Sequence, residues 1–130
     1  MIERIGNWEG IAGLIDNLEK ECKLAVDQSL MRFGLKAEGI AKKHIRDQDL
    51  DWDPLSPAYL AAKLRKGYSE KTMIRTSTYF QNITSWKQGD TAYVGVKRET
   101  LEKDGKPVYE IARLHEYGSL NGIIPARPLW

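Results

Sequence analysis

Hydrophobic residues recur every three to four positions from about Trp8 to Ile45, which predicts an amphipathic helix. Asn7 is a suitable N-cap for it. A continuous helix of this length would reach about 55 Å, whereas a compact chain of this size is about 28 Å across. The helix therefore either breaks near Gly34 or Gly39 or packs in part on another subunit, and the pattern leaves both alternatives open. Its apolar positions are Ile11, Ile15, Leu18, Cys22, Val26, Leu30, Phe33, Ala37, Ile40 and Ala41.

A polar stretch over residues 46–57 predicts a loop, in which we expect Trp52 and Leu55 to anchor the chain to the core. A short amphipathic helix should follow. Ser56 is its N-cap, a proline occupies the first helical position, and Gly67 lies just beyond its end. The apolar residues of this helix are Tyr59, Leu60 and Leu64.

The pattern changes from helical to strand-like between residues 70 and 96. A second short helix is predicted over Glu70 to Phe80, with Ser69 as its cap and with Met73 and Ile74 turned inward beside Phe80. Two β-rich runs, 83–87 and 91–96, then flank a turn at Gln88-Gly89-Asp90, and this arrangement predicts a β-hairpin.

The last third of the chain should extend this small sheet and then return to a helix. A turn at residues 103–106 suggests that residues 96–101 pair with residues 107–109. A helix over 110–117 should stop at Gly118 and lead into a final strand. The fold class expected is α+β in a single domain over residues 1–130. It has a long N-terminal helix (1–47), followed by a core (48–130) of short helices, a small antiparallel sheet and an extended C-terminal tail.

Composition places the chain among ordinary proteins without a membrane span. It has 130 residues, 42% hydrophobic and 29% charged, with no apolar run near the roughly 18 residues of a transmembrane helix. The first residues lack the apolar core of a secretory signal, so we expect synthesis in the cytoplasm without export by the Sec route. Cys22 is the only cysteine, and its place in the helical pattern favours a buried small hydrophobe over a reactive thiol.

No motif in the chain indicates an enzyme or a cofactor site. His115-Glu116 lacks the second histidine of a helical zinc motif, and His44 falls on a different helix. We expect His115 to interact with the last carbonyls of its helix and with the helix dipole. The serines occupy cap or turn positions, and no glycine-rich phosphate loop follows a strand.

A basic cluster between residues 63 and 75 is the one candidate for a nucleic-acid interface. The net charge of +2 is too small to support DNA binding by itself. Interleaved tyrosines would allow stacking on bases, but a solvated helix face with aromatic core residues is the favoured interpretation. The cluster consists of Lys63, Arg65, Lys66, Lys71 and Arg75.

Four segments in order resemble the virion morphogenesis and tail-completion proteins of tailed bacteriophages and Mu-like prophages. They are WDPLSPAYL (52–60), MIRTSTYFQNITSW (73–86), DTAYVGV (90–96), and HEYGS (115–119) with IPARPLW (124–130). The chain departs from the family pattern at Ser77, Tyr79, Tyr117 and Ser119, and its loop over residues 97–109 is longer.

The resemblance implies a non-enzymatic structural protein of the head–tail junction or upper tail, located in the virion. Such proteins form rings, commonly hexameric, that contact the head connector and the tail tube. A tail terminator or assembly factor of the same pathway is the alternative, and a small nucleic-acid-binding module is a second one.

The stiff C-terminal tail is the candidate assembly contact, because prolines reduce the entropy lost on docking. Its residues are Pro125, Arg127, Pro128, Leu129 and Trp130. The competing interpretation is that Leu129 and Trp130 cover the core of their own subunit.

Overall fold

The predicted long helix is a single continuous element, α1 (Trp8–Asp47), in the computed structural model, which describes residues 3, 5–102 and 104–130. Its 40 residues span about 60 Å at the usual rise per residue. The helix does not break at Gly34 or Gly39, so that alternative is wrong. The predicted cap is confirmed, because the Gly10 amide donates to Oδ1 of Asn7 at 2.9 Å.

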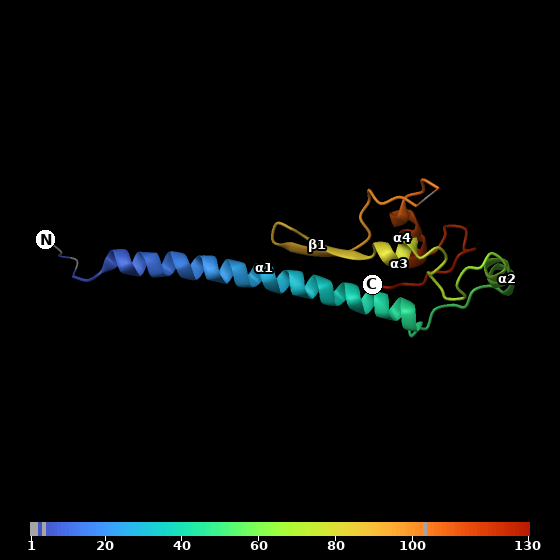
Figure 1. Cartoon of the computed structure of the whole chain (residues 1–130), viewed down its shortest axis with the longest axis horizontal. Helices are drawn as coiled ribbons and strands as arrows, with labels where there is room; N and C mark the ends of the chain where they lie inside the picture. The colour runs from blue at the N-terminus through green and yellow to red at the C-terminus, as the bar shows by residue number, and fades with distance from the viewer. Residues whose placement is uncertain (1–2, 4, 103) are drawn as a thin grey trace.

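The C-terminal end of α1 is fixed to the rest of the chain by Gln48. Its backbone is left-handed (φ 54°), and its amide donates to the His44 carbonyl at 2.9 Å. Its side-chain oxygen accepts the Thr72 amide at 2.9 Å, which joins the end of the helix to a segment 24 residues away. This end of α1 therefore carries the globular part of the molecule, while the other end projects from it (Figure 1).

The predicted hairpin is confirmed to within one residue at each end. Strands β1 (Thr84–Gln88) and β2 (Thr91–Gly95) pair antiparallel around a two-residue turn. The hairpin lies along the C-terminal half of α1 (Figure 1), where Oε2 of Glu38 accepts the Ser85 amide at 2.9 Å. Gly34 allows the close approach, since a Cβ there would lie 3.2 Å from Cβ of Ser85.

The first short helix is confirmed and the second is much shorter than predicted. Helix α2 (Pro57–Arg65) begins after Ser56, whose hydroxyl accepts the Tyr59 amide at 3.4 Å. Helix α3 covers Thr78–Asn82 only, so the predicted helix over residues 70–80 is wrong for its first eight residues. Met73 (φ 63°) and Ser77 (φ 64°) have left-handed backbones that no helix accommodates.

The predicted helix near the C-terminus is confirmed as α4 (Val108–Tyr117), which begins two residues earlier than expected and stops at Gly118 (φ 75°). The predicted strand extension is reduced to one bridge between Leu101 and Pro107. Part of its turn, Lys103, lies outside the described residues. The predicted final strand is wrong: residues 119–130 run as turns and extended chain without strand pairing.

The core is small and lies where α1 ends. Its buried residues are Ala41, Ile45, Met73, Tyr79, Ile83 and Val108, and Trp52, Ile74, Phe80 and Leu129 pack around them. Cys22 is exposed, so the prediction of a buried cysteine is wrong: no described segment covers that face of α1 at this point. None of the described helices combines the length and the apolar character needed to cross a membrane.

Candidate assembly site

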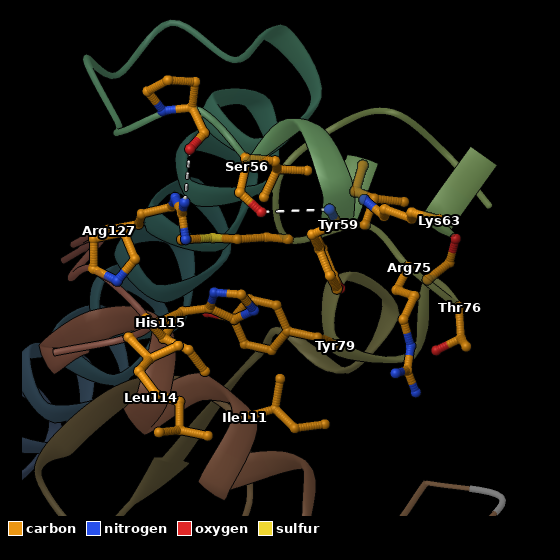
Figure 2. Close-up of a pocket in the computed structure, with 18 of the residues that line it drawn as sticks. Ser56, Tyr59, Lys63, Arg75, Thr76, Tyr79, Ile111, Leu114, His115 and Arg127 are labelled. Atoms are coloured by element: carbon orange, nitrogen blue, oxygen red, sulfur yellow. Dashed lines mark hydrogen bonds between the residues drawn. The ribbon is translucent and has the colours of Figure 1, made fainter. Parts of the chain in front are cut away.

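Arg127 fixes the C-terminal tail to its own subunit. Its side chain is 4% exposed, and its guanidinium donates to the carbonyls of Asp53 (Nε, 2.8 Å) and Pro54 (Nη2, 3.2 Å) (Figure 2). Its backbone amide donates to the His115 carbonyl at 2.6 Å. A planar guanidinium suits two neighbouring carbonyls. The tail is thereby connected to two distant segments at once.

The residues that follow Arg127 continue this attachment. The indole Nε1 of Trp52 donates to the Pro128 carbonyl at 2.8 Å, and the Leu129 amide donates to Oε2 of Glu116 at 2.9 Å. Leu129 also packs against the core. Trp130, in contrast, is 55% exposed.

A tight turn brings α4 and the tail together. The Ser119 amide donates to the Ile124 carbonyl at 2.9 Å, and the Ile124 amide donates back to the Ser119 hydroxyl at 2.9 Å. A Cβ on Gly118 would lie 2.7 Å from the Ile124 carbonyl oxygen and 2.9 Å from the Ala126 nitrogen. Only glycine fits this turn without displacing the backbone.

These contacts divide the predicted assembly contact into two parts. Arg127 and Leu129 are engaged within their own subunit, which supports for Leu129 the competing interpretation that it covers the core. Pro128 and Trp130 remain exposed, and Pro125 is half-buried. The surface that the tail offers to another molecule is therefore limited to its outer side.

The five basic residues between 63 and 75 do not form one exposed stripe. Lys63 is 4% exposed, and its Nζ donates to the Lys71 carbonyl at 2.5 Å. Nζ of Lys71 donates to the Arg46 carbonyl at 2.5 Å, and Arg75 lies over the Tyr68 ring at 5.9 Å. Burial lowers the pKa of Lys63. Arg65 and Lys66 are exposed, but Lys63 and Lys71 are bound to backbone carbonyls, so the candidate nucleic-acid surface is not a continuous row of free basic side chains.

A cavity of about 630 Å³ separates α2 from α4 and from residues 123–127. Figure 2 shows Tyr79 and His115 side by side at its centre, with Lys63 and Arg127 on opposite sides. The remaining wall is mostly apolar and includes Ile111 and Leu114 of α4. The sequence pattern gave no sign of this cavity, because its walls come from five separate segments of the chain.

His115 lies half-buried at this cavity, and its surroundings favour the neutral ring. Nδ1 of its ring is buried without a hydrogen-bond partner among the described residues, and the ring lies 5.6 Å from that of Tyr79. Burial, with the charges of Arg127 and Lys63, lowers its pKa to about 4. The lowered pKa disfavours the charged ring that would interact with the helix dipole, and Nδ1 makes none of the expected bonds to helix carbonyls.

The polar groups of the cavity are occupied mostly in supporting the backbone. The hydroxyl of Ser56 caps α2, and Lys63 and Arg127 hold carbonyls. Within the described ranges, no three His, Cys, Asp or Glu side chains gather closely enough to hold a metal ion. No protein-family model, curated protein or solved structure matches the chain.

Proposed function

We propose that this chain is a non-enzymatic structural protein of a tailed bacteriophage or prophage. It would act at the head–tail junction or upper tail, completing the tail and joining it to the head. It would assemble with copies of itself into a ring and dock on the head connector and the tail tube. Its place of action would be the neck or tail of the virion.

One observation carries this proposal: two of the segments that resemble the tail-completion family, far apart in the chain, bond directly to each other. The WDPLSPAYL segment supplies the carbonyls of Asp53 and Pro54, which accept hydrogen bonds from Arg127 of the IPARPLW segment. The HEYGS segment supplies Gly118 and Ser119 for the turn onto which the tail folds. The segments that carry the resemblance therefore form one connected part of the fold.

The exposed surface of α1 supports the mode of action. Its N-terminal half projects beyond the hairpin and carries large apolar side chains, among them Leu18 at 64% exposed. An exposed apolar surface of this extent is typical of a protein that completes its packing in an assembly. A tail terminator or assembly factor of the same pathway would use the same surface, and it remains the alternative.

Immunogold labelling of purified virions tests the proposal. A tag at the projecting N-terminus should place gold between head and tail in particles of the phage that encodes this chain. Gold elsewhere on the particle would contradict the neck assignment, and absence from mature virions would favour the assembly factor. An untagged virion preparation is the control.

A further inference from the structure

One face of α1 carries a line of exposed apolar side chains along nearly its whole length. They recur every three to four residues up to residue 26 and then at two spacings of seven residues, and they extend over about 44 Å of helix. Their exposed fractions are large even beside the hairpin, where Phe33 reaches 72%. We call this line the bare stripe: Ile11, Ile15, Leu18, Cys22, Val26, Phe33 and Ile40.

The hairpin covers a different face of α1. It packs against Gly34 and is held by Glu38 and Asp27, whose carboxylates bind Ser85 and Lys87. At 100° per residue, this face lies roughly 140° around the helix from the bare stripe. The hairpin also ends near Asp27, so none of the described segments packs against the first half of α1 (Figure 1).

The charges of α1 are divided between its two halves. Residues 8–22 contain four acidic residues and one lysine, whereas residues 23–46 contain six lysines and arginines and two acidic residues. Two such helices side by side in parallel would place like charges together. Reversing one of them sets the acidic half of each against the basic half of the other.

We propose that α1 pairs antiparallel with α1 of a second copy of this chain, with the two bare stripes in contact. The pair would be twofold symmetric and closed at two copies. It does not rest on the proposed function, because it follows from the surface of the helix alone, and it would add to any contact that builds a ring.

The length of the stripe sets the register of the pair. Full overlap places Ile11 of one copy opposite Ile40 of the other, so the twofold axis passes near residues 25 and 26. Glu21 and Arg32 are exposed and lie three helical turns apart, on the same side of the stripe. In a twofold antiparallel pair these sides face each other, so Glu21 of each copy comes close to Arg32 of its partner.

The two globular ends do not collide in this arrangement. Each hairpin covers its own α1 from about Asp27 onward. In the proposed register, the half of α1 that carries the hairpin lies opposite residues 6–24 of the second copy. The hairpin of the second copy does not reach those residues. The two hairpins therefore follow one another along the pair, and each projecting half gains a neighbour.

Disulfide trapping tests the direction of pairing. Ser29 lies on the stripe two turns after Cys22, and its hydroxyl donates only to Ala25 of its own helix. In the antiparallel register, residue 29 faces residue 22 of the second copy. The Ser29→Cys variant should therefore form a covalent dimer under mild oxidation.

The matched controls carry one cysteine each. The unaltered chain, with Cys22 alone, should stay uncrosslinked, because the two thiols would be about 10 Å apart along the axis. Ser29→Cys combined with Cys22→Ser should behave in the same way. Crosslinking of either single-cysteine chain would show a parallel pair and overturn the proposal, as would absence of crosslinking in the Ser29→Cys variant.

Charge reversal gives an independent readout of the same register. Glu21→Arg and Arg32→Glu should each weaken dimerisation at least tenfold in sedimentation experiments, and the double variant should recover it. Both residues are exposed, so circular dichroism should show an unchanged fold. A monomeric unaltered chain, or a double variant as weak as the single ones, would overturn the proposal.

Discussion

Arg127 shows how a residue singled out from its motif can take a different role in the structure. It stood out in a proline-rich tail that predicted docking on a neighbour. Its partners instead are backbone carbonyls of its own subunit, at Asp53 and Pro54. Sequence spacing could not reveal a contact between residues more than 70 positions apart.

Arg127→Met should destabilise the fold by about 2–4 kcal/mol, because it removes the hydrogen bonds that the buried guanidinium donates to the carbonyls of Asp53 and Pro54. Urea unfolding of the purified variant measures this loss. Arg65→Met removes an exposed arginine and should change the free energy of unfolding by less than about 0.5 kcal/mol. Equal effects of the two substitutions would contradict the role given to Arg127.

His115 should make stability depend on pH between about 7 and 5. Its pKa is lowered to about 4 in the fold, whereas the unfolded chain binds the proton near 6.5. The unfolded state therefore binds the proton first as the pH falls. The free energy of unfolding decreases by about 2 kcal/mol over this range. Above pH 7 both states are neutral, and the contribution is complete.

Urea unfolding at several pH values tests this, with His115→Asn as the comparison because asparagine does not titrate. The variant should lose most of the slope between pH 7 and 5. Glu38 and Asp49, whose pKa values are lowered by Lys42 and His44 respectively, contribute to the slope mainly at more acidic pH. A slope unchanged in the variant would contradict the lowered pKa of His115 in the fold.

At the scale of elements, signals from neighbouring residues predicted most helices and strands well. The prediction failed where contacts with distant parts of the chain determine the backbone conformation. The hairpin, α2 and α4 were predicted because their turns, caps and periods lie within a few residues of each other. Residues 70–77 of the predicted helix are not helical, because the Thr72 amide donates to Gln48 and the backbone is left-handed at Met73 and Ser77. That choice depends on a partner 24 residues away.

Gly118→Ala should be far more destabilising than Gly67→Ala. Both glycines have positive φ, at 75° and 72°, so each alanine costs about 1–2 kcal/mol in backbone strain. The added methyl meets backbone atoms only at Gly118, which should add a further 1–3 kcal/mol, roughly the cost of overpacking. Thermal unfolding of both variants compares them directly, and similar melting temperatures would contradict the tight turn.

At the scale of the whole molecule, α1 has two apolar faces: one packs within this subunit and the other is exposed. The sequence pattern alone could not assign each apolar residue to one of them. Residues such as Leu30 and Ala41 turn toward the hairpin and the core, while Phe33 and Ile40 remain outside. The spacing of apolar residues along the helix shows that it has an apolar side. It does not show which segment or molecule packs against that side. The continuous helix excludes the break at Gly34 or Gly39, and the external partner stays a prediction.

The proposed neck function predicts the phenotype of a phage that lacks this chain. Such a phage should still make DNA-filled heads and separate tails, because neither part contains the missing joint. Arg65→Met, the exposed control above, should restore joined particles when supplied in trans. Leu18→Glu removes one member of the bare stripe and should restore fewer of them.

Electron microscopy of lysates from the deletion strain is the most direct test of the account. The account predicts unjoined heads and tails, and whole virions once the intact gene is supplied. Normal infectious virions in the absence of the chain would contradict it.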